Sequence, residues 1–107
     1  MTSVPSRKNL PSLTDPMLVR NVEEKIEDVE GFQVNFLHQR SGNDVRGHKD
    51  IGGNYKYDYK AKNGYTVSNW IENRFKNNFP GYDVEVLNGN GEPVPGNTKL
   101  ETVRSSY

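Results

Sequence analysis

The sequence predicts an α+β domain in which a small, mostly antiparallel three-stranded sheet carries helices on one face. Apolar residues recur at helical spacing within residues 15–31 and 66–79, whereas apolar and polar residues alternate within 32–38, 55–60 and 82–86. A short helix after residue 98 completes the order α-β-β-α-β-α. At 107 residues the chain has the length of one domain, and we divide it into a flexible arm over 1–14 and a single domain over 15–107.

The first helix is predicted from its caps and its period. Asp15 is a typical N-cap, and Pro16 follows at the first helical position, where proline is well tolerated. Gly31 is a natural C-terminal stop. The apolar face between them is formed by Leu18, Val19, Val22, Ile26 and Val29.

The first two predicted strands flank a long glycine-rich segment. Residues 32–38 form the first strand, and the run Tyr55-Lys56-Tyr57-Asp58-Tyr59-Lys60 alternates aromatic with charged side chains as a second strand would. An Asn63-Gly64 turn follows it. Residues 40–53 hold four glycines among polar and charged residues and are predicted to be a long loop, a feature that is often functional or mobile.

The remaining elements are predicted from caps and turns. Thr66 is predicted to cap a second helix that ends near Phe79, before Pro80-Gly81, and its core face holds Val67, Trp70, Ile71 and Phe75. Residues 82–86 form the third strand, and residues 88–91 a turn. The prolines at 93 and 95 confine the segment after that turn to a sheet edge. Thr98 and Glu101 have capping-box spacing for a C-terminal helix.

Composition narrows the classes of protein. The chain has no cysteine, which excludes disulfides, thiolate metal sites and cysteine nucleophiles. Its first residues show neither a secretory signal nor a membrane span, so we expect a cytoplasmic protein without membrane contact. Val, Leu, Ile and Phe together make up only 24 of the 107 residues, which predicts a thin core. A homodimer would bury further apolar surface and is expected on that ground.

Charge is balanced overall but unevenly distributed. Net charge is zero, yet residues 15–30 carry an excess of four acids and residues 38–76 an excess of four bases. One interpretation is that the two segments lie side by side and neutralise each other. The other is a basic face for an anionic partner. On the second interpretation we assign phosphate contacts to Arg40, Arg46, Lys49, Lys56, Lys60 and Lys62.

The leading hypothesis is a small nucleic-acid-binding protein, with a regulatory role, that contacts phosphates through the basic loop and the tyrosine–lysine strand. Aromatic side chains interleaved with lysines can stack bases, or they can simply pack one face of a strand. The glycine loop lacks the order of residues found in a P-loop, so a nucleoside triphosphate site is not expected.

Two alternatives remain open. One is a protein-interaction module without a nucleic-acid role, using the acidic helix or the edge after Asn88. The other is a small metal-independent ribonuclease, with His38 or His48 as general base and Lys49 or Arg46 stabilising the phosphorane. The histidine spacing matches no zinc pattern, and we expect neither a metal nor a small-molecule cofactor. A binding protein is favoured over an enzyme.

Part of the chain resembles a known group of sequences. The runs Gly64-Tyr65-Thr66-Val67, Trp70-Ile71-Glu72 and Arg74-Phe75 carry the resemblance, together with 80–87 and 96–100. They are similar to small uncharacterised proteins encoded on plasmids and mobile islands of plant-associated proteobacteria such as Xanthomonas. The resemblance covers roughly residues 64–104. It implies a cytoplasmic, dimeric α+β protein with a role connected to nucleic acids, and it supplies no family site to carry over.

Overall fold

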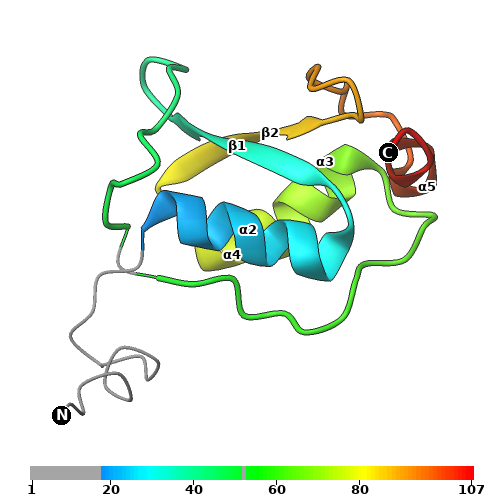
Figure 1. Ribbon diagram of the computed structural model, residues 1–107, viewed down its shortest axis with the longest axis horizontal. Coiled ribbons are helices and arrows are strands. Elements are labelled where there is room, and N and C mark those ends of the chain that lie inside the picture. The colour runs from blue at the N-terminus through cyan, green and yellow to red at the C-terminus, as the bar shows by residue number, and fades with distance from the viewer. Residues whose placement is uncertain (1–17, 52) are drawn as a thin grey trace, which may run out of the picture.

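The computed structural model describes residues 18–51 and 53–107 and shows a layer of helices beneath a small sheet (Figure 1). Helix α2 spans Val19–Glu30, and the strands are β1 (Gln33–His38) and β2 (Tyr82–Leu87). A second helical stretch runs through α3 (Val67–Trp70), the π-helical turn η1 (Ile71–Phe75) and α4 (Lys76–Asn78), and α5 spans Leu100–Ser105. The α+β class is therefore confirmed. The predicted arm over 1–14 lies outside the described residues.

The sheet has two antiparallel strands, so the predicted third strand is wrong. In the register of β1 and β2, Gln33 lies opposite Leu87 and His38 lies opposite Tyr82. Residues 55–60 are extended but pair with neither strand. We call residues 53–65 the strap. The two strands expected over 32–38 and 82–86 are present as β1 and β2.

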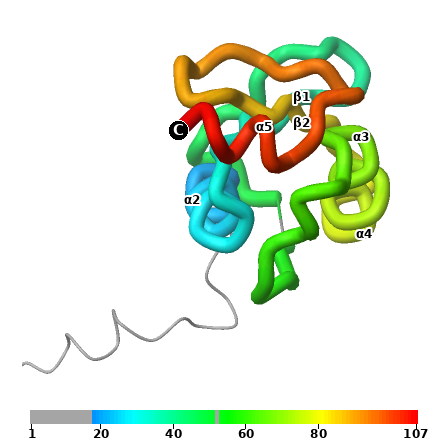
Figure 2. Tube along the Cα trace, turned by 90° about the vertical axis from the view of Figure 1, so that its right-hand side faces the viewer, coloured from blue at the N-terminus to red at the C-terminus, as the bar shows by residue number. Residues whose placement is uncertain are grey.

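The strap cannot join the sheet because it lies on the opposite side of the helices. Figure 1 shows the sheet above α2 and α4 and the strap below them, and Figure 2 shows the strap running below, between the two helices. Side chains take the place of strand partners for its backbone. Lys25 Nζ donates to the Tyr55 carbonyl at 3.1 Å, and the Lys56 N–H donates to Asn78 Oδ1 at 2.8 Å. These bonds satisfy backbone groups that a ladder would otherwise pair.

Helix α2 ends as the sequence predicts. Gly31 adopts a left-handed conformation with φ of 83°, and its N–H donates to the Glu27 carbonyl. Its N-cap is Leu18, which is extended and makes no side-chain capping bond, so the predicted start at Asp15 and the predicted place of Leu18 on the helical face are wrong. Asp15 and Pro16 themselves lie outside the described residues. The buried face is formed by Val19, Val22, Ile26 and Glu30.

The second helical stretch begins at the predicted cap and contains a π-helical turn. Thr66 and Asn69 form a reciprocal capping box, each side chain accepting from the other's backbone N–H. The Lys76 N–H donates to the Ile71 carbonyl, five residues earlier. The wider turn places Trp70 and Phe75, also five residues apart, on the same buried face.

Aromatic rings fill the space between the sheet and the helices. The Trp70 ring meets the Phe32 ring edge-on at 5.1 Å between centroids, and the Phe36 ring meets those of Phe75 and Phe79 at 4.9 and 5.2 Å. All five side chains are buried, which confirms Trp70 and Phe75 as core residues. Edge-to-face contacts add to the free energy gained from apolar burial.

The C-terminal segment covers the outer edge of β2 and one end of the core. The Val94 N–H donates to the Val86 carbonyl at 2.9 Å, so the segment holding the two prolines does lie at the sheet edge. Helix α5 is present, but its N-cap is Lys99 without a side-chain bond, and the predicted Thr98 capping box is absent. None of the helices in the described part of the chain has the length and apolar character that crossing a membrane requires.

Candidate nucleic-acid interface

A fully buried carboxylate, Glu30, holds the strap against the helices. It occupies the last position of α2 and has no exposed surface. Its Oε1 accepts from the Ala61 N–H at 2.9 Å and from Arg104 Nη2 at 3.0 Å. Its Oε2 accepts from Arg74 Nη1 at 2.7 Å and from the Tyr55 hydroxyl. Two strap residues and two arginines from other elements thus meet at one side chain.

Tyr55 is the inner anchor of the strap. Its side chain is completely buried, and its hydroxyl accepts a hydrogen bond from the Trp70 indole N–H at 3.0 Å while donating to Glu30. Burial raises the pKa of Tyr55 well above its ordinary value, and the adjacent Glu30 carboxylate raises it further. The phenol therefore stays protonated and donates to the carboxylate throughout the physiological range.

Arg74 fixes the middle of the strap. Its Nη1 donates to the Tyr59 carbonyl at 2.5 Å as well as to Glu30, and its guanidinium lies 4.4 Å from the centroid of the Tyr57 ring. A guanidinium held over an aromatic face contributes cation–π attraction. The backbone at Tyr59 is therefore fixed, although the Tyr59 ring lies outside the core.

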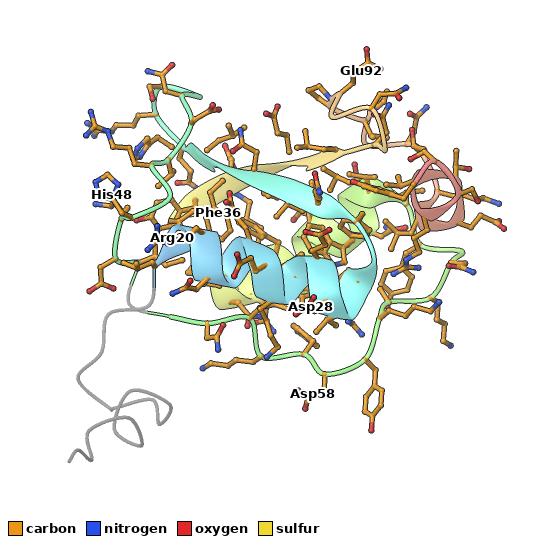
Figure 3. All side chains as sticks on the ribbon, in the orientation of Figure 1. Arg20, Asp28, Phe36, His48, Asp58 and Glu92 are labelled. Atoms are coloured by element: carbon orange, nitrogen blue, oxygen red, sulfur yellow. The ribbon has the colours of Figure 1, made fainter. Side chains whose placement is uncertain are left out.

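The outer side of the strap presents one aromatic ring and three lysines. Tyr59 has 83% of its surface exposed, whereas Tyr55 has none and Tyr57 is half-buried. The alternation fails at residue 59, where the chain bends. Around this ring, the exposed charged residues of the strap are Lys56, Asp58, Lys60 and Lys62. Figure 3 shows Asp58 directed away from the body of the molecule.

The other three predicted contacts lie on the loop between β1 and the strap. Arg40, Arg46 and Lys49 are all exposed, and the loop is anchored among them by Val45, which is 4% exposed and donates its N–H to the Phe36 carbonyl at 2.9 Å. Figure 1 places this loop beyond one end of the sheet and the strap beneath the helices. The six predicted residues therefore form two groups of three on successive segments.

One ion pair, between Glu30 and Arg74, joins the acidic segment to the basic segment. Across residues 18–51 and 53–107, the ion pairs are Glu30 with Arg74, Glu30 with Arg104, and Lys76 with Asp83. None of the six predicted basic residues belongs to one. Of the acids on α2 only Glu30 forms an ion pair within the described ranges. Glu24, Glu27 and Asp28 are exposed, whereas Glu23 is half-buried.

The two histidines, each a candidate general base, lie in different surroundings. His38 is half-buried at the end of β1, with its ring centroid 6.3 Å from that of Tyr82, and His48 is exposed on the loop (Figure 3). Within the described ranges, no group of three or more His, Asp or Glu side chains could hold a metal ion. The ribonuclease alternative stays a prediction.

Sequence reasoning missed Glu30, although its spacing carried information. Val22, Ile26 and Glu30 follow one another every fourth residue, so a helix that buries the first two also turns the third toward the core. A carboxylate in that position needs cationic partners. Arg74 and Arg104 supply them from 44 and 74 residues further along the chain.

Comparisons with protein-family models, with curated proteins and with solved structures gave no match to this chain. The resemblance over residues 64–104 stays a prediction.

Proposed function

We propose that this protein binds single-stranded nucleic acid along the strap, with Tyr59 stacking on a base and Lys56, Lys60 and Lys62 contacting phosphates. The observation that carries the proposal is the exposure of the Tyr59 ring, 83%, on a backbone that Arg74 holds in place. Such a ring stacks on any unpaired base, whereas the bases of a duplex are already stacked on one another.

The surrounding charges support the same proposal. Lys56, Lys60 and Lys62 are exposed and lack ion pairs among the described residues, so their charges are available to phosphates. The strap is extended and is fixed at Tyr55, Tyr59 and Ala61 by the Glu30 and Arg74 bonds. A rigid extended backbone loses little conformational freedom when it binds a strand. Arg40, Arg46 and Lys49 would lengthen the basic path beyond the strap.

The test is fluorescence anisotropy with labelled random single-stranded DNA and RNA of about 16 nucleotides, the upper end of common site sizes. Wild-type affinity should fall linearly with salt on a log–log plot between about 50 and 200 mM. Replacing all three strap lysines with Gln should reduce the slope by roughly 2, since each phosphate contact on a single strand contributes about 0.7. The absence of binding at the lowest salt concentration would refute the proposal.

Two matched variants sharpen the test. Replacing Arg40, Arg46 and Lys49 with Gln removes an equal number of charges from the loop. A smaller loss of affinity than in the strap variant would show that the strap makes the main contacts. Tyr59→Ala should weaken binding about 5- to 150-fold, the value of one base stack, while Tyr59→Phe should retain it. Arg20→Gln, which removes an exposed charge from α2, should leave affinity nearly unchanged. Losses that follow only the number of charges removed, wherever those charges lie, would point to nonspecific attraction only.

We also propose that the protein acts as a homodimer in the cytoplasm. A dimer would bury further apolar surface, which a thin core leaves in short supply. Light scattering at micromolar concentration measures the mass directly. A monomer would refute the dimer and leave the strap proposal standing, because all strap contacts lie within one chain.

A further inference from the structure

A groove of about 270 Å³ lies between α2 and the outer edge of β1, on a surface separate from the strap. Helix α2 lines it with Arg20, Glu23, Glu24 and Glu27, β1 lines it with Gln33 and Val34, and Leu87 of β2 completes the lining. Three acids face one base there. Glu24 and Glu27 are exposed, and no residue of 18–51 or 53–107 forms an ion pair with any of the three acids.

The edge of β1 is closed at Phe36. The Phe36 N–H donates to Glu23 Oε2 at 3.0 Å, and the Phe36 carbonyl accepts from the Val45 N–H at 2.9 Å. Both bonds are on the side of the strand that faces away from β2. The Glu23 carboxylate thus occupies the position of a carbonyl from an added strand.

The same edge is open at Val34. In an antiparallel pair the backbone groups of alternate residues point to the same side, so the Val34 N–H and carbonyl face outward like those of Phe36. No other described residue bonds to them on that side. Val34 is only 6% exposed, and unpaired backbone groups at such depth are unusual in folded proteins. An open edge at the floor of a groove is the arrangement by which β-sheets capture an extended peptide.

We propose that this groove binds an extended, lysine- or arginine-rich segment of a partner protein, which pairs with the Val34 backbone and places basic side chains against Glu24 and Glu27. Successive side chains of an extended segment alternate in direction, so basic residues two positions apart would both face α2. The two main-chain hydrogen bonds at Val34 would fix the register, and the charges would select the partner.

Other occupants fit this groove less well. Nucleic acid would be repelled by three carboxylates, which separates this site from the strap. A second copy pairing through the same edge would bring the glutamates of both copies together, because a two-fold interface sets identical surfaces against each other. The Gln33 Nε2 donates to Glu27 Oε2 at 3.4 Å, a long bond that an incoming cation could readily replace.

The probe is the labelled peptide Ac-Lys-Val-Lys-Val-Lys-Val-NH2, with its Glu-Val counterpart as the charge control. We expect anisotropy to show binding of the lysine peptide and none of the glutamate peptide. The double variant Glu24→Lys with Glu27→Lys should weaken binding of the lysine peptide at least about tenfold. It reverses the charges at the rim of the groove without disturbing the core. Circular dichroism checks that the double variant folds. Lack of binding at about 1 mM peptide would overturn the proposal.

A backbone control separates edge pairing from charge attraction. The same lysine peptide N-methylated at every residue keeps its charge but cannot donate main-chain hydrogen bonds to the Val34 edge, so it should bind at least about tenfold more weakly. The Val34 amide should show one of the largest shifts in a nitrogen–proton NMR spectrum. Equal affinity of the methylated peptide, or an unmoved Val34 amide, would overturn the inference, and neither outcome bears on the strap.

Discussion

Arg104 of α5 binds Glu30, the last residue of α2, twice, across 74 residues of sequence. Its Nη2 lies 3.0 Å from Glu30 Oε1, and its Nε donates to the Glu30 backbone carbonyl at 2.7 Å. A third bond, from Nη1 to Asn63 Oδ1 at 2.7 Å, reaches the strap. One side chain of α5 therefore fixes the end of α2 and the end of the strap together.

Glu30→Ala should destabilise the fold by about 3–5 kcal/mol, because it leaves two partly buried arginines and the Ala61 N–H without their acceptor. For a domain of this size that is a large share of the total stability. Urea unfolding followed by tryptophan fluorescence measures the change. Glu24→Ala removes an exposed carboxylate that has no ion pair within 18–51 and 53–107. It is the control and should stay within about 0.5 kcal/mol. A similar small change in both variants would contradict the structural role of Glu30.

Tyr55→Phe should cost about 1–3 kcal/mol near neutral pH, since it leaves the Trp70 N–H without an acceptor and Glu30 without one of its donors. The cost should shrink as the pH rises. The unfolded tyrosine ionises near its ordinary pKa of about 10, whereas burial raises the pKa of Tyr55 in the fold, so wild-type stability falls above that pH. Urea unfolding of both proteins at about pH 8 and about pH 11 tests the convergence. If the stability difference between wild type and Tyr55→Phe is the same at both pH values, the buried phenol does not have the role proposed for it.

The elements that could be predicted depend on residues close together in sequence. The Thr66 cap, the Gly31 stop and the alternation of 82–86 are local patterns, and the structure confirms each. The strap has the same alternation, yet its backbone bonds to side chains from distant elements, such as Lys25 and Asn78. No local period reveals such partners, so a strand was predicted where the chain is extended but unpaired.

The candidate site was predictable in part for the same reason. Composition and charge located the lysines of the strap, and the structure shows them exposed. Which tyrosine faces solvent could not be read from the alternation, because Arg74 and a bend at residue 59 decide it. The depth of Glu30 likewise depends on Arg104, which the sequence places far away.

Gly89→Ala should destabilise the protein by about 1–3 kcal/mol, because the turn over 88–91 lies against the end of α5. A Cβ added at Gly89 would stand 1.9 Å from the Ser106 carbonyl oxygen, so the backbone of one segment would have to move. The Gly89 N–H also donates to Ser106 Oγ at 2.9 Å, a bond that such a shift would break. Gly64→Ala, where no atom lies within 4 Å, is the matched control. Thermal unfolding compares the two, and equal midpoints would contradict the close approach.

Glu23→Gln should stabilise the protein at neutral pH. Burial raises the pKa of Glu23, and nearby Asp44 adds to this, so the folded state holds its proton to a higher pH than the unfolded state does. Ionisation as the pH rises toward 7 therefore costs stability, a cost that glutamine avoids while its carbonyl still accepts from Phe36. The advantage of the variant should vanish at about pH 3, where Glu23 is protonated in both the folded and the unfolded state. Urea unfolding midpoints of wild type and Glu23→Gln at both pH values test this expectation. A variant that is still more stable than wild type at low pH would contradict it.

Asp58→Asn should strengthen binding of single-stranded nucleic acid by about 1.5- to 5-fold, the usual worth of one exposed charge interaction. Asp58 is exposed on the strap beside Tyr59, where its carboxylate repels the phosphates that Lys60 would attract. Glu92→Gln removes one acid from the opposite side of the molecule, as Figure 3 shows, and should leave affinity unchanged. Anisotropy at low salt compares the two variants with wild type. Because both raise the net charge equally, an equal gain would show that overall charge, and not the strap, governs binding, and no gain from Asp58→Asn would place the nucleic acid elsewhere.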